Sequence, residues 1–398
     1  MRVLHITPTH FGDASIVGGA ERYAWELARA MARDAEVTFL ALADAGTEFE
    51  RDGVHVVHAA GRQVLSHPLA RNPLSRRLFR AIRRTDVVHC HQAQTFVTSA
   101  AVVAARMIGR PVFVTDLGGG HPYSPAHYLP ILRLASGFLL VSEYSRRLWA
   151  ERPRRARPDR MEVIYGGVDT GLFRPLDHRT IGLSDHRAIG LSDHRAIDPS
   201  GPRSEVLYVG RLLPHKGIEH LIAAIEPPFA LRIVGRPYDL PYLAMLKDRA
   251  RGQAITFEPD VDDRGLVERC RSALALVLPS VSTDWLGRTT DVSELFGLVV
   301  VEAMACGIPV IVSRTGSLPE LVEDGVTGFI VPPADPAEIR RRLRELYADP
   351  TRSAEMGRRA HDVVLQRFTW AATARRCLDA YLGRAAARPS SSDTGVGA

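Results

Sequence analysis

The sequence predicts an α/β protein built from two successive doubly wound domains, each with a parallel sheet. Its 398 residues exceed what one hydrophobic core usually holds. Short apolar runs alternate with helical patterns from the N-terminus, and this alternation starts again after residue 203. Strands separated by helices in this order are typical of βαβ units, whose strands run parallel. We therefore expect the two domains to cover residues 1–174 and 204–366.

The strands of both domains are expected where the short apolar runs occur. In the first domain these runs are RVLHIT, EVTFLAL, VHVVHAA, DVVHC, PVFVTDL and GFLLVS, and in the second they are EVLYVGR, LRIVGR, AITFEP, ALALVLPS, PVIVS and GFIVPP. After the first run, the turn VGGAE leads into a helix. Its apolar residues recur at three- and four-residue spacing, at Ala20, Ala24, Leu27, Ala28 and Met31. The ligand site is expected in the loops that follow the strands, because such domains bind ligands at the carboxyl ends of their strands.

A linker is expected between the domains, over residues 175–203. It contains the sequence IGLSDHRA twice in succession, at 181–188 and 189–196. A repeat of eight residues is too short to form a packing unit, so we interpret it as a tandem expansion in a polar, disordered segment. The alternative is a metal site, but this spacing in a flexible segment fixes no ligand geometry. The histidines concerned are His178, His186 and His194.

A further helix is expected after the second domain, over residues 367–386. Its apolar residues Trp370, Cys377 and Tyr381 can pack against either domain. The tail over residues 387–398 consists mainly of small and polar residues, and it is expected to be disordered.

Composition limits the classes of ligand. The net charge of +6 favours an anionic ligand or an anionic membrane surface. No nucleic acid is expected, because the base-stacking aromatics of an RNA-recognition fingerprint are missing. The cysteines lie far apart without a CxxC pair, which argues against a disulfide framework or a zinc site and fits a reducing cytosol. They are Cys90, Cys270, Cys306 and Cys377.

The absence of targeting and membrane-spanning patterns in the sequence predicts a cytoplasmic protein. The opening MRVLHITPTH lacks the basic region of a signal peptide. No apolar run approaches the roughly 20 residues that span a bilayer. Membrane contact, if any, is expected only at the protein surface.

Lysine usage singles out one loop. The chain contains only two lysines, Lys216 and Lys247, and its other basic residues are arginines. Lys216 lies five residues after Arg211, between a predicted strand and a predicted helix. Two cations on such a loop can clamp a diphosphate, with arginine as a planar fork and lysine as a compact point charge. A solvated surface pair is the alternative, but a merely solvated cation in this chain is expected to be arginine.

A second motif is SELFGLVVVEAMACGIPVI, in which Glu294 precedes a predicted helix and Glu302 lies inside it. The helix is expected to begin near Gly297 and to end at Gly307. Glu294 and the free N–H groups of the first turn would then face the same ligand, while Glu302 would accept hydrogen bonds from a vicinal diol such as a ribose. A glycosidase acid/base pair fits less well, because it needs two carboxyls across one bond.

Two glycine-containing turns are also expected among the loops at the carboxyl ends of the strands. Gly18 and Gly19 precede the first helix and allow close backbone approach to an anion. The turn is not GxGxxG, so a dinucleotide site is only weakly indicated, and an ordinary turn before a helix explains it equally well. In GSLPELVEDGVTGFIVPP, Glu320 is as well explained by a structural role as by ligand contact.

Together these motifs resemble the nucleotide-sugar glycosyltransferases of family 4, which have the GT-B fold of two Rossmann-like domains facing across a cleft. The stretches GGAERY, VIYGGVDTGLF, YVGRLLPHKG, LPS, ELFGLVVVEAMACGIPVI and GSLPELVEDGVTGFIVPP occur in the family order and cover most of the chain. The resemblance also implies that the helix introduced by FTW crosses back to the first domain.

The resemblance implies roles for the donor-site residues. Arg211 and Lys216 would hold the donor diphosphate, and Glu302 would bind the ribose. Glu294, with the backbone of Phe296, Gly297 and Leu298, would position the sugar, and Gly19, next to Gly18, would approach the diphosphate from the first domain. The family transfers sugar with retention of configuration and needs no bound metal or cofactor, because cations and a helix dipole supply the electrostatics.

One position departs from the family pattern. Members often have a histidine near the reacting sugar where this chain has Leu117, in VTDLGGGH. Asp116, His121 and His91 are the candidate replacements, and each is equally well explained as a polar loop residue. The departure puts the catalytic assignment in doubt more than the donor binding.

The segment LARNPLSRRLFRAIRR, residues 69–84, predicts a basic amphipathic helix. It either rests on an anionic membrane or is a solvated helix with an apolar face toward the core. The arginines concerned are Arg71, Arg76, Arg77, Arg80, Arg83 and Arg84.

We therefore expect a retaining hexosyltransferase that uses a UDP- or GDP-sugar and a hydroxyl acceptor on a glycan, a lipid-linked glycan or a small molecule, in polysaccharide or glycolipid synthesis. A nucleotide-sugar epimerase of the same fold and an inactive nucleotide-sugar-binding scaffold remain as alternatives. A phosphorylase would need a lysine bound to pyridoxal phosphate, and Lys216 is already assigned.

Overall fold

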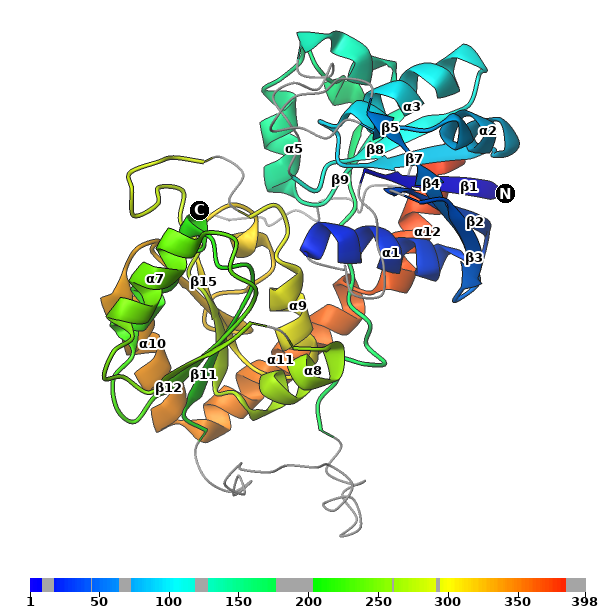
Figure 1. Cartoon of the computed structure of the whole chain (residues 1–398). Helices are drawn as coiled ribbons and strands as arrows, with labels where there is room; N and C mark the ends of the chain where they lie inside the picture. Colours follow the sequence, from blue (N-terminus) through cyan, green and yellow to red (C-terminus); the bar gives the residue numbers. More distant parts are fainter. Residues whose placement is uncertain are drawn as a thin grey trace, which may run out of the picture.

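The computed structural model describes residues 1–8, 18–43, 45–63, 73–118, 128–176, 203–259, 261–290 and 294–383. Figure 1 shows two α/β domains, each with a central sheet flanked by helices. All named strand pairs of the two large sheets are parallel except one hairpin. The predicted fold class is confirmed. The predicted domain boundaries stay a prediction, and the repeated IGLSDHRA segment lies outside the described residues.

The first sheet has eight strands in the order β10-β9-β8-β7-β1-β2-β4-β3. The strands at the predicted apolar runs are β1 (Arg2–Thr7), β2 (Glu36–Ala43), β4 (Val54–Ala60), β7 (Val87–His91), β8 (Val112–Thr115) and β9 (Gly137–Leu140). The sequence reasoning missed β3 (Thr47–Arg51) and β10 (Met161–Val163), and also a small separate pair, β5 (Arg62–Gln63) with β6 (Pro73–Leu74).

Helices cover both faces of the first sheet. They are α1 (Gly19–Met31), α2 (Arg76–Arg84), α3 (Phe96–Met107) and α5 (Glu143–Ala150). Adjacent residues of β1 point to opposite faces, so Val3 joins the core that contains α1, while Leu4 joins the core that contains α2 and α3. The apolar stripe predicted for α1 is buried from Ala24 to Met31.

The second sheet has the order β13-β12-β11-β14-β15-β16, and all of its strands are parallel. Its strands are β11 (Glu205–Val209), β12 (Ala230–Val234), β13 (Ile255–Glu258), β14 (Ala275–Leu278), β15 (Val310–Ser313) and β16 (Gly328–Val331). The helices are α6 (Ile218–Ala224), α7 (Leu240–Arg249), α8 (Asp263–Ser272), α9 (Leu298–Ala305), α10 (Pro336–Ala348) and α11 (Pro350–Arg367). The strand order reverses between β11 and β14, which is where doubly wound domains bind ligands.

The final described helix, α12 (Trp370–Tyr381), lies against the first domain beside α1 (Figure 1). The Thr373 hydroxyl donates to the carbonyl of Tyr165 over 2.9 Å, and the Arg376 guanidinium donates to the carbonyl of Val163 over 2.6 Å. The chain therefore enters the second domain and returns to the first.

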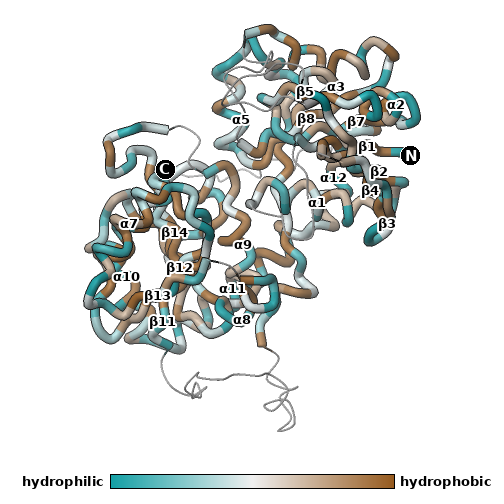
Figure 2. Tube along the Cα trace, viewed as in Figure 1, coloured by the Kyte–Doolittle hydropathy of each residue, from teal (hydrophilic) through white to brown (hydrophobic). Residues whose placement is uncertain are grey.

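Hydropathy follows these layers. Figure 2 shows hydrophobic residues along the strands of the second sheet and a larger share of hydrophilic residues at the periphery of both domains. Among the described helices, none combines the length and the apolar character needed to cross a membrane. In α2 the apolar Leu78 and Ile82 are buried, so they face the core and not the solvent.

Candidate functional site

The residues predicted to bind an anion lie at the point where the second sheet reverses its strand order. Arg211 and Lys216 follow β11, and Ser280 follows the neighbouring strand β14. Lys216 closes the short 3-10 helix Pro214–Lys216, which leads into α6. The two loops are joined by a hydrogen bond from the Val281 N–H to the His215 carbonyl, at 2.9 Å.

Lys216 forms a buried ion pair with Glu294. Its Nζ donates to Oε1 of Glu294 over 2.5 Å, and the same oxygen accepts a hydrogen bond from the Ser280 hydroxyl at 2.7 Å. Only 12% of the lysine side chain and 8% of the glutamate side chain are exposed. The lysine and the glutamate that the sequence singled out therefore lie together, in a position where a compact ammonium fits.

Two glycines allow this close approach. Gly217 has φ +63°, and a Cβ at this position would lie 2.3 Å from the Pro279 carbonyl oxygen. Gly316 has φ +60°, and a Cβ there would lie 2.3 Å from the Glu294 carbonyl oxygen. A side chain at either glycine would push apart the loops that carry Lys216 and Glu294.

Arg211 is placed differently from Lys216. It is exposed, and its guanidinium carbon lies 5.8 Å from the centre of the Tyr238 ring. Its carbonyl oxygen accepts a hydrogen bond from the buried Tyr208 hydroxyl at 3.2 Å. Of the two residues predicted to clamp the diphosphate, Lys216 is therefore buried and Arg211 lies at the surface.

Helix α9 begins as the sequence predicts. Gly297 is its N-cap, with φ +92°, and Leu298 is the first helical residue; within the part of the chain that the structure describes, no side chain caps this end. The first N–H groups of the helix consequently lack an internal acceptor and carry the positive end of the helix dipole. The side chain of Phe296 packs toward Tyr165 and Phe368, at ring distances of 6.3 and 6.1 Å, so it serves the packing of the domains.

Glu302 lies inside α9 and is buried, with 5% of its surface exposed. Its Oε1 lies 3.3 Å from Nε of Arg22, which belongs to α1 of the other domain. Arg22 also pairs with Asp263 at 3.0 Å. Burial raises the pKa of Glu302, and the Arg22 charge opposes that rise. The carboxylate expected to bind a diol is thus occupied by an arginine from across the domain boundary.

Gly18 and Gly19 place the start of α1, in the first domain, next to the start of α9 in the second. Gly18 is the N-cap of α1, and a methyl group on Gly19 would lie 3.6 Å from Cδ1 of Leu298. The beginning of α1 therefore contacts the beginning of α9, and the predicted residues of both domains meet.

Glu320 also joins the two domains. Its carboxylate accepts hydrogen bonds from the N–H groups of Glu143 and Tyr144, at 2.8 and 2.6 Å, and from the Tyr165 hydroxyl at 3.1 Å. Glu320 thereby caps the N-terminus of α5 in the first domain. Burial and the Glu320 carboxylate raise the pKa of Tyr165 to about 12. Of the two readings left open for Glu320, this geometry favours the structural one.

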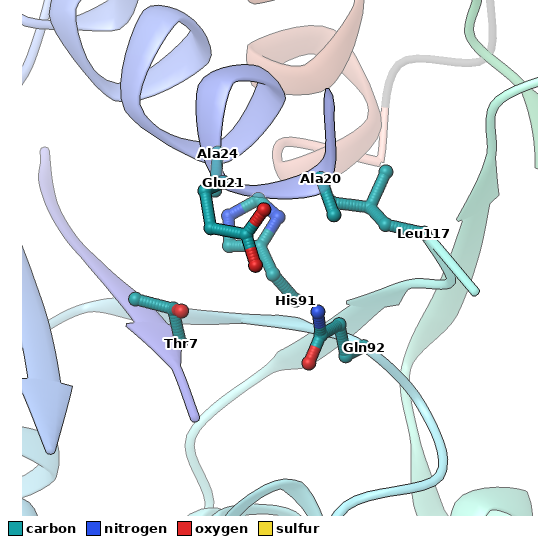
Figure 3. A pocket seen from close by; sticks show the side chains of 7 residues that line it. All are labelled: Thr7, Ala20, Glu21, Ala24, His91, Gln92 and Leu117. Atoms are coloured by element: carbon teal, nitrogen blue, oxygen red, sulfur yellow. The ribbon is translucent and has the colours of Figure 1, made fainter. Parts of the chain in front are cut away.

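The three candidate replacements for the family histidine have different surroundings. Asp116 is buried, and its two oxygens accept hydrogen bonds from the Trp149 indole at 2.8 Å and from the Ala93 N–H at 3.4 Å. Burial raises the pKa of Asp116. His91 lines a pocket together with Leu117, as Figure 3 shows. His121 lies outside the described residues.

Two contributors to this site escaped the sequence reasoning. Arg22 lies in the motif GGAERY, three residues after Gly19, on the first turn of the helix. Ser280 lies two residues after the end of β14, and the rule that ligands bind after strand ends would have selected it. No sequence pattern pairs Arg22 with Glu302, because the two residues lie in different domains.

Two family models match this chain. The model described as Glycosyltransferase Family 4 matches residues 17–172, and the model described as Glycosyl transferases group 1 matches residues 192–363. Together they cover the Gly18-Gly19 turn and the loops of Lys216 and Glu294. The chain belongs to the family 4, group 1 glycosyltransferases.

Named relatives agree with this family. D-inositol 3-phosphate glycosyltransferase from Acidothermus cellulolyticus is 32% identical over 57% of this chain and 48% of its own length, so the match spans about half of that relative. GDP-mannose-dependent alpha-(1-6)-phosphatidylinositol monomannoside mannosyltransferase from Mycolicibacterium smegmatis is 28% identical over 83% of this chain and 76% of its own length.

Solved structures agree with the fold. Sucrose-phosphate synthase from Thermosynechococcus elongatus has a TM-score of 0.71 at 22% identity and covers 96% of this chain and 99% of its own. HepE from Anabaena, solved in complex with UDP, has a TM-score of 0.72 at 19% identity and covers 96% of this chain and 100% of its own. The architecture is GT-B.

Proposed function

We propose that this protein is a retaining glycosyltransferase that moves a hexose from a UDP- or GDP-sugar to a hydroxyl of a glycan, a lipid-linked glycan or a small molecule. The observation that carries the proposal is the buried pair of Lys216 and Glu294, in which Glu294 lies shortly before Gly297, the N-cap of α9, a helix end that no side chain of a described residue caps. A cation and free N–H groups at one strand-order reversal suit a diphosphate. The two nucleotides are supported by the relative named for GDP-mannose and by the fold neighbour solved with UDP.

In this mechanism Lys216 neutralises negative charge that develops on the departing nucleoside diphosphate. Arg211 reaches the diphosphate from the surface of the same loop, and the first N–H groups of α9 add the helix dipole. Glu294 orients the ammonium of Lys216 and, once the donor binds, contacts a hydroxyl of the hexose. These fixed charges supply stabilisation where a metal ion would otherwise be needed.

Glu302 binds the ribose diol in the loaded site. Arg22 holds one oxygen of this carboxylate in the present structure, so the ribose competes with the guanidinium for Glu302. Arg22 keeps Asp263 as a second partner, so its charge is not left alone after the exchange.

We also propose that the protein acts at the cytoplasmic face of the membrane, in polysaccharide or glycolipid synthesis. Leu78 and Ile82 of α2 are buried, so the helix offers its arginines, together with the exposed Phe79, to an anionic surface. Contact with the bilayer would then be peripheral and sensitive to salt.

The test is to incubate the purified protein with UDP-, GDP-, ADP- and TDP-hexoses, with and without EDTA, and to follow release of the nucleoside diphosphate. We expect slow release from one uridine or guanosine donor, unaffected by EDTA, and a product of unchanged anomeric configuration by NMR. Binding without turnover would favour a scaffold, and an epimerised sugar without transfer would favour an epimerase. No binding of any of the four donors would reject the proposal.

A further inference from the structure

Three neighbouring elements of the first domain contain no acidic residue. They are α2, α3 and the stretch 128–134, which includes the 3-10 helix Pro130–Leu134. α3 contacts both of the others, and it lies beside α2 in the upper part of Figure 1. All three elements contain arginine, so the formal charge of each has the same positive sign.

The scarcity of acidic residues extends along the sequence around these elements. Residues 53–142 contain ten arginines, and their only acidic residues are Asp86 and Asp116. The Asp86 carboxylate pairs with the guanidinium of Arg2 at 2.8 Å, and Asp116 is buried. Neither of these two carboxylates belongs to α2, α3 or the stretch 128–134, so neither interrupts the positive charge of those elements.

Large apolar side chains are exposed on the same side of the domain. Of the sixteen large hydrophobic residues that are exposed in the described part of the chain, seven lie on these elements or at the C-cap of α3. Met107 is 82% exposed and Leu129 is 56% exposed. Such a concentration of exposed apolar side chains marks a surface that binds a partner. We call it the α3 surface, and it consists of Phe79, Val103, Met107, Ile108, Tyr128, Leu129 and Leu134.

The sequence of α3 explains why its outer face is apolar. The helix reads FVTSAAVVAARM, and Arg106 is its one charged residue. Val97 and Val102 are buried in the core, whereas Val103 and Met107 are exposed. A helix at the surface of a soluble domain normally has charged and polar residues on the side away from the core. α3 is instead apolar on both sides, apart from Arg106.

Exposed arginines accompany these apolar side chains. Arg77 is paired with Glu48 of β3 at 2.8 Å, so it is set apart from the others. A bilayer with anionic headgroups offers a uniformly negative surface above an apolar interior, and it therefore matches a surface of one positive sign with exposed apolar side chains. The exposed arginines are Arg76, Arg80, Arg83, Arg84, Arg106 and Arg133.

We propose that the α3 surface docks on an anionic lipid bilayer, with its apolar side chains inserted between the headgroups and the exposed arginines in contact with the lipid phosphates. The 12 residues of α3 span about 18 Å, which is shorter than the hydrocarbon core of about 30 Å, so the helix lies in the plane of the interface. The inference rests on the membrane location in the proposed function, and it names the surface that makes the contact.

Two double variants test the proposal by co-sedimentation with vesicles of phosphatidylcholine and phosphatidylglycerol in equal parts. Met107→Gln with Leu129→Gln removes apolar side chains from the α3 surface without changing the charge. Leu240→Gln with Leu365→Gln is the matched control, because these leucines are 70% and 48% exposed on helices of the second domain. We expect the first double variant to bind the vesicles at least about tenfold more weakly than the wild type, and the control to bind as the wild type does.

Salt separates the apolar contribution from the electrostatic one. In about 0.5 M NaCl the Debye length is only about 4 Å, so the attraction between exposed arginines and headgroups is largely screened. Insertion of apolar side chains is not screened. We therefore expect the wild type to keep part of its vesicle binding at this salt concentration and the Met107/Leu129 variant to lose it.

Four outcomes would overturn the proposal. The wild type could fail to bind the mixed vesicles, or the Met107/Leu129 variant could bind them equally well. Wild-type binding that disappears completely in high salt would mean that the arginines act alone. A wild-type dimer in light scattering that this variant dissociates would assign the surface to a second copy of the chain.

Hydrolysis of the nucleotide sugars without vesicles keeps this proposal apart from the transferase function. Both double variants should hydrolyse the donor as the wild type does, because their substitutions lie outside the proposed donor site. If no nucleotide sugar is bound or hydrolysed, the transferase function fails, and vesicle binding still decides the role of the α3 surface.

Discussion

Glu294 and Glu302 belong to one motif, yet Glu294 pairs with a residue of its own domain and Glu302 with a residue of the other domain. Both are buried, with 7% and 5% of their surfaces exposed. Glu294 pairs at 2.5 Å with Lys216 of the same domain, whereas Glu302 pairs at 3.3 Å with Arg22 of the other domain. The Lys216–Glu294 pair does not depend on the relative position of the two domains. The Arg22–Glu302 pair exists only while the two domains are in contact. The comparison teaches that the pair proposed to serve the phosphate is already formed within one domain, whereas the carboxylate proposed to bind the ribose is in a contact between the two domains.

The largest expected effect comes from breaking the preformed pair. Glu294→Ala removes a hydrogen-bond acceptor of both Lys216 and Ser280, and we expect sugar transfer to fall by about 10²–10³-fold, as for other fixed polar groups at reacting centres. The chain should stay folded, because the loops around Glu294 are also held by backbone hydrogen bonds. Circular dichroism melting provides the control, and near wild-type transfer would remove Glu294 from the site.

Lys216→Arg asks whether the site needs a point charge. The charge is retained, but the planar guanidinium is wider than an ammonium and must fit where Nζ now lies 2.5 Å from Glu294. We expect transfer to fall by at least about tenfold, with nucleotide still bound. Unchanged kinetics would show that the scarcity of lysine in this chain does not explain its presence here.

Changes at the second pair should act in opposite directions. Glu302→Gln weakens the hydrogen bonds to the ribose, so we expect nucleotide affinity to fall about tenfold. Arg22→Gln frees the Glu302 carboxylate, so affinity should rise by up to about fivefold, the usual limit for a partly exposed ion pair. Calorimetry with UDP and GDP measures both. Changes of the same sign would mean that Arg22 supports the nucleotide and does not compete with it.

The smallest expected effect is a pH dependence of stability. Because burial raises the pKa of Glu302, the folded chain holds a proton there that the unfolded chain has already released. Stability should therefore fall as pH rises from the unfolded pKa to the raised folded one. Urea unfolding across this range should show a flatter pH profile for Glu302→Gln, and identical profiles would argue that Arg22 cancels the effect of burial.

The sequence alone predicted the strands that bury most of their apolar residues. All twelve apolar runs became strands, and every one except β13, at the edge of the second sheet, contains buried residues, as expected for a parallel sheet covered by helices. Strand β3 escaped because every residue in TEFER is exposed, although the Asp52-Gly53 turn after it is a hairpin signal. The edge strand β10 has only three partly buried residues and gave no apolar run.

The candidate site was predictable only where its residues are close in sequence or follow strands. Lys216 and Glu294 were found in this way, and Glu302 was placed correctly inside α9. Their partners follow from tertiary contact, as with Arg22 against Glu302 and Trp149 against Asp116. No local pattern encodes such a contact, because it depends on how separate elements and domains pack.

The central claim is that Lys216 binds the diphosphate of a nucleotide sugar. The chain supplies its own control in Lys247, which is exposed on α7. With the donor that the wild type hydrolyses, we predict that Lys216→Ala lowers turnover by at least about 10²-fold, while Lys247→Ala leaves it unchanged and both variants melt as folded proteins. Ser280 still donates to Glu294 in the first variant, which keeps the carboxylate partnered. Full turnover by Lys216→Ala would contradict the claim.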